Sequence, residues 1–406
     1  MSSVRMVRFN SITLKAEPDS ERNNNKQNDA LYSEADFGFF YAVCFVISII
    51  TFAVDILLHC WLAYLFYMKT EMLYFVLTIT FIIVPSIVST GFSMRWYILD
   101  EDDETSPSKP SLIKWSLRIL TMLLQITQIH RYFDALLYGL RSSFAGCRKQ
   151  LMKQDYLYRK MLDEDCDAAL LRLFYCVLNS APQAVLQLTI LLTYRIEKTY
   201  KFEDLKFLYA SVGVSIFSIA WSLTVYNRTV RYIREDKKRL SFMGTVMNFI
   251  SQFSWAVSRV FALSVFATWY PKFTLLGCLI HTSLMSVWLM LKQDVNHSRC
   301  DECVLSCMLG IAYIFVFIPS HGGPQRYSYL SYYSICLLEN IGCLYIWYSF
   351  GAPITDVDLY YGMMIVQVFS FFASLFFLVL YYRCFHPNRR SIGDRVYEIR
   401  ELNSNR

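Results

Sequence analysis

The feature that most limits how this chain can fold is the apolar run 170–192, which carries regularly spaced polar side chains and one internal proline, Pro182. About 20 mostly apolar residues can cross a bilayer as a helix, and this run is long enough. Four polar residues recur in it at spacings of seven, four and four, which places them on one side of a helix: Arg172, Asn179, Gln183 and Gln187. Because polar groups in hydrocarbon are costly, this side must face protein or water. It either packs on neighbouring helices or lines a polar pathway.

The composition indicates a membrane protein with several spans. Hydrophobic residues make up 55% of the chain and charged residues only 18%, whereas soluble domains contain about 25% charged residues. The net charge of +6 is concentrated in particular loops, so it informs orientation and does not indicate nucleic-acid binding. Ten apolar segments are predicted, at 38–66, 73–94, 117–140, 170–194, 207–226, 242–268, 275–291, 304–319, 328–350 and 359–382.

The distribution of Lys and Arg predicts which segments cross, because positive charge collects in short cytoplasmic loops. Segment 117–140 has basic loops on both sides, so we expect it to enter and leave on the same side, as a re-entrant or interfacial helix. Segment 304–319 is too short to cross easily. The predicted fold is an all-α polytopic membrane protein of about eight transmembrane helices plus two re-entrant or half-inserted helices, with both termini in the cytoplasm.

The predicted topology divides the chain into two halves that resemble a parallel repeat in topology alone. The segments are a disordered cytoplasmic tail (1–36), an N-terminal membrane repeat (37–226), a basic cytoplasmic linker (227–241), a C-terminal membrane repeat (242–382) and a cytoplasmic tail (383–406). The 12 cysteines are scattered and do not form a disulfide framework.

One cysteine cluster has spacing compatible with zinc: His297, Cys300, Cys303 and Cys307. Cys307 already enters an apolar segment, so free or lipid-modified thiols are the favoured interpretation, and Cys384 is a second candidate for palmitoylation. We therefore expect no metal and no cofactor.

Polar residues also recur in three other apolar segments. They are Ser48, Thr51, Asp55 and His59 in the first, Asn248, Gln252 and Arg259 in the sixth, and Glu339 beside Asn340 in the ninth. Charges at membrane depth usually face a cavity or an opposite charge. Two acids, Asp55 and Glu339, can therefore neutralise two bases, Arg172 and Arg259. These pairs either specify packing or belong to a pathway.

Several short motifs resemble those of the XK-related membrane proteins. They are Leu-Arg-Leu-Phe at 171–174, Ala-Pro-Gln at 181–183, Leu-Gln-Leu at 186–188 and Ser-Arg-Val-Phe-Ala-Leu at 258–263, with Asp55 shortly before Trp61. The resemblance covers most of 37–385. It implies eight spans with two half-inserted segments, and lipid scrambling that exposes phosphatidylserine at the plasma membrane, typically after caspase cleavage of a tail. It also implies partners, either single-pass glycoproteins or large lipid-transfer proteins, and a second copy of the chain is a further candidate.

The resemblance assigns intramembrane charges to Asp55, Arg228, Arg259 and Glu339. It also shows departures. His59, Tyr175, Asn179 and Val225 stand where some members of the family carry acids. The polar track of this chain is therefore less acidic than theirs.

A polar groove explains how such a protein could move lipids without an energy source. Hydroxyls, amides and paired charges give the headgroup substitute partners while its tails stay in the bilayer. The sequence has no nucleotide-binding motif (Gly-x-x-x-x-Gly-Lys-Ser/Thr), no zinc-binding helix motif (His-Glu-x-x-His) and no nucleophile motif (Gly-x-Ser-x-Gly). We therefore do not expect this protein to be an enzyme. The candidate pathway residues are Asp55, His59, Arg172, Asn179, Gln183, Gln187, Arg228, Arg259 and Glu339.

Two aspartates in the N-terminal tail are candidate caspase sites. Asp19 precedes the small Ser20, and Asp36 adjoins the first span. The leading hypothesis is thus a scramblase of the plasma membrane, activated by cleavage. The alternatives are a membrane adaptor that anchors a partner, and an ion or solute transporter that uses the same polar residues.

Overall fold

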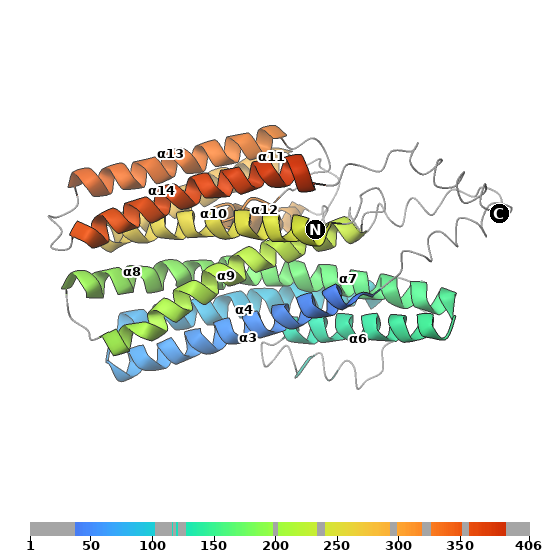
Figure 1. Ribbon diagram of the computed structural model, residues 1–406. Helices are drawn as coiled ribbons and strands as arrows, with labels where there is room; N and C mark the ends of the chain where they lie inside the picture. Colours follow the sequence, from blue (N-terminus) through green and yellow to red (C-terminus); the bar gives the residue numbers. More distant parts are fainter. Residues whose placement is uncertain are drawn as a thin grey trace.

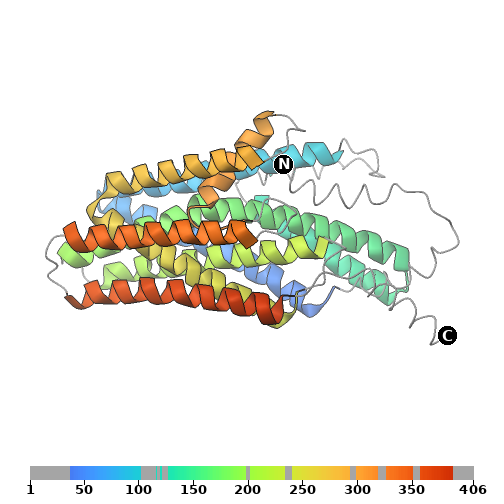
Figure 2. The same ribbon diagram turned by 90° about the horizontal axis from the view of Figure 1, so that it is seen from above.

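The computed structural model describes residues 37–101, 116, 119–120, 127–197, 202–233, 240–292, 299–318, 326–350 and 357–386. Every regular element of this part is a helix, and the helices run close to the long axis of an elongated bundle (Figures 1 and 2). They are α3 (Phe39–Met68), α4 (Met72–Glu101), α6 (Thr127–Cys147), α7 (Leu151–Tyr175), η1 (Cys176–Ser180), α8 (Ala181–Glu197), α9 (Phe202–Ile233), α10 (Phe242–Trp269), α11 (Pro271–Lys292), α12 (Arg299–Ala312), α13 (Arg326–Phe350), α14 (Val357–Leu380) and η2 (Tyr381–Phe385).

Seven helices of the described chain are long and apolar enough to span a membrane, which confirms an all-helical polytopic protein. They are α3, α4, the continuous helix formed by α7, η1 and α8, then α9, α10, α11 and α14. The remaining span that the sequence predicts is α13. It has 25 residues and packs against α10, but Glu339 and Asn340 lower its hydropathy.

The helix that contains the 170–192 run begins at Leu151, well before the apolar run, and continues through η1 into α8. The π turn η1 accommodates Pro182, which has no N–H to donate to the carbonyl four residues earlier. The chain widens here, so that the backbone N–H of Ala181 bonds to the carbonyl of Cys176, five residues back. Such π turns occur frequently at functional sites.

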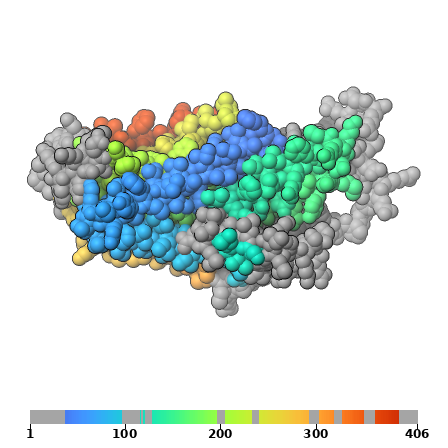
Figure 3. All heavy atoms as spheres, turned by 90° about the horizontal axis from the view of Figure 1, so that it is seen from below, coloured from blue at the N-terminus to red at the C-terminus, as the bar shows by residue number. Residues whose placement is uncertain are grey.

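A helical hairpin projects beyond one end of the bundle. Helix α6 runs antiparallel to the first part of α7, and the two extend past the other helices (Figure 1) and lie beside α3 in Figure 3. Arg131 on α6 holds the pair together, since its guanidinium contacts Glu164 at 3.2 Å and Asp167 at 3.0 Å on α7. Most of 117–126 lies outside the described residues, so the predicted re-entrant segment is seen only from Thr127 onward.

Helix α12 stops inside the bundle, as predicted for 304–319. Its 14 residues rise about 21 Å, less than the roughly 30 Å of a hydrocarbon core. Gly310 lets α12 lie directly against α11, because a Cβ at this position would be 2.1 Å from Ser286 Oγ and 2.9 Å from the carbonyl oxygen of Thr282. The chain that follows, residues 313–318, remains buried.

The described chain enters and leaves the bundle at the same end. Phe40 near the start of α3 contacts Phe242 at the start of α10, with ring centroids 5.4 Å apart. Arg231 near the end of α9 donates to the His386 ring after η2. Helix α9 continues to Ile233, so the first part of the predicted 227–241 linker is helical. One hydrophobic core extends through both halves of the chain.

Candidate functional site

Three helices turn polar faces toward one another and form a buried polar core. Helix α3 contributes Asp55 and His59, the α7–η1–α8 helix contributes Arg172 and Asn179, and all four are at most 1% exposed. Helix α9 contributes a row of fully buried serines, Ser211, Ser215, Ser218 and Ser222. The sequence-predicted residues of the first half therefore converge on one interior.

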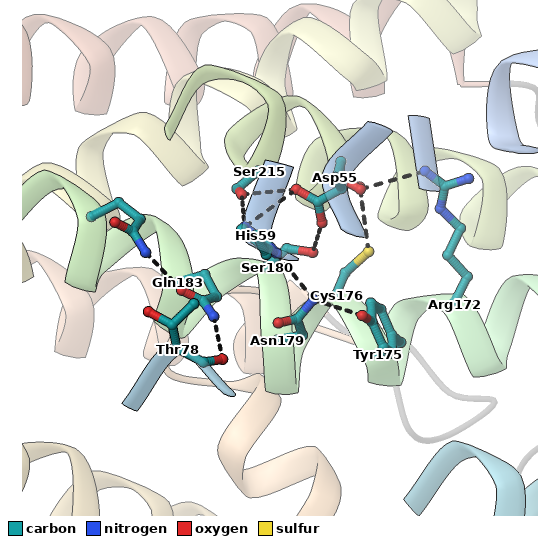
Figure 4. Close-up of polar contacts among 12 residues, drawn as sticks. Asp55, His59, Thr78, Arg172, Tyr175, Cys176, Asn179, Ser180, Gln183 and Ser215 are labelled. Atoms are coloured by element: carbon teal, nitrogen blue, oxygen red, sulfur yellow. Dashed lines mark hydrogen bonds and ion pairs between the residues drawn. The ribbon is translucent and has the colours of Figure 1, made fainter. Parts of the chain in front are cut away.

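Asp55 lies at the centre of this polar core. Ser180 Oγ donates to its Oδ2 at 2.6 Å, and Ser215 Oγ donates to its Oδ1 at 2.8 Å (Figure 4). His59, one turn further along α3, places Nε2 3.0 Å from Ser215 Oγ and 3.7 Å from Asp55 Oδ1. The carboxylate is thus stabilised by two hydroxyls and a nearby imidazole.

The π turn brings adjacent residues into the same interior. Asn179 Nδ2 donates to the Tyr175 hydroxyl at 2.8 Å and lies 3.4 Å from His59 Nδ1, while its neighbour Ser180 binds Asp55 (Figure 4). In a regular α-helix consecutive side chains are about 100° apart. The wider turn lets both side chains reach the core.

Among the residues that the structure describes, Arg172 pairs with no acidic side chain, contrary to the expected neutralising pair. Its guanidinium donates to the carbonyl of Ser48 and to Thr51 Oγ1, both on α3, and approaches Ser218 Oγ on α9 at 3.5 Å. Asp55 sits one or two turns further along α3 and has its own partners. Arg172 and Asp55 therefore lie at successive positions along the axis of α3. Each is stabilised by its own polar groups, Arg172 by the Ser48 carbonyl and the Thr51 hydroxyl, and Asp55 by two serine hydroxyls.

Arg228 lies at the end of the core nearest the start of α3. Its nearest acid is Asp165 on α7, whose Oδ2 is 4.0 Å away and accepts a hydrogen bond from Thr229 Oγ1 at 3.0 Å. The guanidinium carbon lies 4.9 Å from the centre of the Tyr41 ring. Asp165 precedes Arg172 by seven residues, so the polar face of α7 begins earlier than the apolar run indicated.

Gln183 and Gln187 face α4 instead of the Asp55 group. Gln183 Nε2 donates to the carbonyl oxygen of Thr78 at 2.9 Å, and Gln187 Nε2 donates to Gln183 Oε1 at 3.0 Å. Figure 4 shows Gln183 and Thr78 to one side of Asp55. The two glutamines therefore continue the polar face of α8 toward a different neighbour.

Arg259 and Glu339 form a second cluster on other helices. Arg259 Nη2 donates to Glu339 Oε2 at 2.9 Å, which confirms this expected pair, and His281 Nδ1 lies 2.6 Å from Glu339 Oε1. The cluster holds the carbonyls that follow α12, because Arg259 Nε donates to Ile314 O at 2.9 Å and Trp255 Nε1 to Phe315 O at 2.8 Å. These hydrogen bonds satisfy backbone carbonyls just after the end of α12.

Sequence reasoning missed the serines of α9 and Asp165. The serines recur at spacings of four, three and four, which is a helical face, but single hydroxyls hardly interrupt an apolar run. Asp165 lies in a charged stretch that looks like a loop when only apolar length is considered. Spacing alone was the signal that could have found both.

The remaining predicted residues lie elsewhere. Asp19, Asp36 and His297 lie outside the described residues. Cys303 and Cys307 are exposed on α12, and Cys384 is exposed on η2. No group of three or more potential metal ligands is found in the described part of the chain.

Comparison with known proteins gives a consistent result. The profile of the XK-related protein family matches residues 43–387. The chain is 28% identical to cell death abnormality protein 8 of Caenorhabditis briggsae, over 86% of this chain and 78% of that protein. It is 27% identical to cell death abnormality protein 8 of Caenorhabditis elegans, over 86% of this chain and 79% of that protein.

Proposed function

Because this chain belongs to the XK-related protein family, we propose that it moves phospholipids, phosphatidylserine among them, between the leaflets of the plasma membrane without ATP. The observation that carries the proposal is the polar core between α3, the α7–η1–α8 helix and α9, built around Asp55. Both relatives carry the name cell death abnormality protein, which links this family to cell death.

The chemistry of the polar core suits a lipid headgroup. Arg172 and the serine hydroxyls donate hydrogen bonds, and Asp55 accepts them. Water supplies both kinds of bond at the membrane surface, and a headgroup in hydrocarbon loses them at a cost of several kcal/mol. Because the core residues are almost fully buried, a headgroup passes only when α3, α9 and the α7–η1–α8 helix separate. The structure therefore represents the closed state of the proposed pathway.

We place the control of this opening in the N-terminal tail. The tail leads directly into α3, which supplies Asp55 and His59 to the core. A caspase-type cut after Asp19 would remove the first part of the tail, and a cut after Asp36 would remove all of it. Both termini and the α6–α7 hairpin lie on the cytoplasmic side in this proposal, where such a protease acts.

The test is reconstitution of the purified full-length chain in vesicles that contain a trace of fluorescent phospholipid. Reduction of the outer-leaflet dye then reports lipid exchange, with and without prior cleavage at the tail, and in the absence of nucleotide. A dye-leak measurement excludes broken vesicles. Exchange above that of protein-free vesicles supports the proposal. Absence of exchange from both cut and uncut protein contradicts it.

A second candidate function is a membrane adaptor for a single-pass glycoprotein or a lipid-transfer protein. The projecting hairpin favours it, since it carries exposed apolar side chains, among them Phe144 on α6 and Met152 on α7. A stable complex from a membrane extract together with no lipid exchange would favour the adaptor. Ion flux without lipid exchange would instead indicate an ion or solute transporter.

A further inference from the structure

Arg228 is a buried arginine whose guanidinium has no nitrogen or oxygen partner at hydrogen-bond distance in the described chain. Only 1% of the residue is exposed. Its neighbours in the described chain are the Cys44 thiol, which interacts with the guanidinium, and Asp165 Oδ2 at 4.0 Å, so no carboxylate or carbonyl oxygen accepts a short hydrogen bond from Nε, Nη1 or Nη2. Asp165 Oδ1 and the Tyr41 hydroxyl are equally buried and equally unpartnered within the described chain. Three polar groups from α9, α7 and α3 are thus unsatisfied around one point.

The other buried arginines show that this arrangement is unusual for the protein. Arg131 donates to Ser93, Glu164 and Asp167, and Arg259 donates three hydrogen bonds. A buried polar group without a partner costs about 1–3 kcal/mol, and a charged group costs more. Buried donors left without a close partner at such a cost call for an explanation, and binding a ligand is one.

The unsatisfied atoms define the chemistry of that ligand. The guanidinium presents a planar fork of N–H donors, which suits a phosphate or carboxylate. Asp165 Oδ1 and the Tyr41 hydroxyl can accept hydrogen bonds from a primary ammonium. The rings of Tyr41, Phe40 and Tyr232 surround the site, with centroids 4.9, 5.6 and 6.0 Å from the Arg228 guanidinium carbon. The site is therefore complementary to a zwitterion.

The position of the site connects it to the polar core. Asp165, Arg172 and Asn179 follow one another at spacings of seven along the same helical face. Tyr41 lies in the first turns of α3 and Arg228 in the last turns of α9, so the site is at the end where the chain enters the bundle. A headgroup bound here would lie about two helical turns from Arg172 along α7.

We propose that Arg228, Asp165 and Tyr41 form a receiving site for phospholipid headgroups that carry both a phosphate and a primary ammonium. The phosphate binds the guanidinium of Arg228, and the ammonium binds Asp165 and the Tyr41 hydroxyl. Phosphatidylserine and phosphatidylethanolamine have this chemistry, whereas phosphatidylglycerol lacks the ammonium. The inference rests on the proposed lipid pathway, and the site is the first place on that pathway where a headgroup binds.

The test measures headgroup preference directly. Full-length protein is placed in phosphatidylcholine vesicles with trace spin-labelled phosphatidylserine, phosphatidylethanolamine or phosphatidylglycerol, and the protein-immobilised fraction of each is compared. We expect the two amine-bearing lipids to be enriched over phosphatidylglycerol. In the double variant Arg228→Gln/Asp165→Asn, which leaves no lone buried charge, the enrichment should fall about tenfold, equivalent to about 1.4 kcal/mol.

The matched control lies on the same helix. Arg159 and Asp155 also form an arginine–aspartate pair, at 3.0 Å, but on the partly exposed side of α7. The variant Arg159→Gln/Asp155→Asn should keep the wild-type preference. Competition with soluble compounds separates headgroups from free phosphate, since glycerophosphoserine should displace the labelled lipid and inorganic phosphate should not.

Three results would overturn the inference. They are equal enrichment of phosphatidylglycerol, an unchanged preference in the Arg228/Asp165 variant, and displacement by phosphate alone. If that variant does not fold, as judged by gel filtration and thermal unfolding, the competition series on wild-type protein decides. Lipid exchange without headgroup preference contradicts this site and leaves the proposed function standing, whereas preference without exchange contradicts only the proposed function.

Discussion

Asp55 and Ser180 are joined by a 2.6 Å hydrogen bond although 125 residues separate them in the chain. The bond connects α3 to the end of the π turn, next to Pro182. Together with the bond from Ser215, it stabilises a carboxylate at membrane depth by hydroxyl groups and not by an arginine. Hydroxyls rotate and exchange partners easily, so this arrangement suits the opening of the core that the proposed function requires.

Replacing Asp55 by Asn should reduce lipid exchange in reconstituted vesicles about tenfold, the effect of losing about 1.4 kcal/mol. The amide has the shape of the carboxylate but cannot accept from both serines and has no charge for the headgroup amine. Asp134→Asn is the matched control, because Asp134 also sits one turn from a histidine, His130, but on partly exposed α6. Equal exchange rates for the two variants would contradict a role of Asp55 in the pathway.

Changing either member of the Arg259–Glu339 pair should destabilise the protein. Loss of one partner from a buried ion pair costs about 3–5 kcal/mol, and we expect the lower end because a third of the Glu339 side chain is exposed. The double variant Arg259→Gln/Glu339→Gln should lose less than the sum of the single variants. Thermal unfolding in detergent, followed by gel filtration, measures this. Additive losses would show that the two side chains act independently.

Gly310→Ala should loosen α12 from α11. The added methyl group would overlap Ser286 Oγ and the carbonyl of Thr282, and such overpacking typically costs about 1–3 kcal/mol. Gly277→Ala on α11 is the control, since nothing lies within 4 Å of its Cβ position. Hydrogen exchange of α12 amides is the readout. Similar protection in both variants would mean that the close approach of the two helices is unnecessary.

The charge distribution makes a prediction about orientation. Cys147, exposed at the end of α6, should resist a membrane-impermeant maleimide in intact cells and react once the cells are permeabilised. A cysteine placed at Lys69, in the turn between α3 and α4, should react in intact cells. Peptide mass spectrometry distinguishes each site from the other exposed thiols. Labelling of Cys147 in intact cells would reverse the proposed topology.

The polar face of the 170–192 run was predictable because helical periodicity is a local property. The contacts of its members were not. The expectation that Arg172 pairs with an acid was wrong, since the level of Asp55 along α3 depends on how α3 and α7 pack, and Arg172 meets the Ser48 carbonyl there instead. Every residue has a backbone carbonyl, so the sequence does not indicate which carbonyl will accept a hydrogen bond from a buried arginine.

The positions of the helices were likewise predictable from the sequence, whereas their ends were not. Apolar length located the long apolar helices, but it placed the start of the fourth segment near 170, whereas the helix begins at Leu151. The additional turns carry Asp165 and the acids that bind Arg131, and they are held by packing against α6. The pairing of distant charges such as Arg259 and Glu339 was predictable only as opposite signs at similar depth.

One continuous helix, from Leu151 to Arg195, belongs to both the hairpin and the polar core. Its 45 residues extend about 68 Å at 1.5 Å per residue. A partner protein bound to the hairpin would therefore be connected, through this one helix, to the residues of the polar core. The π turn, which contains Asn179 and ends at Ser180, is the place where this helix can bend, so a force on the hairpin would act first on the hydrogen bond between Ser180 and Asp55.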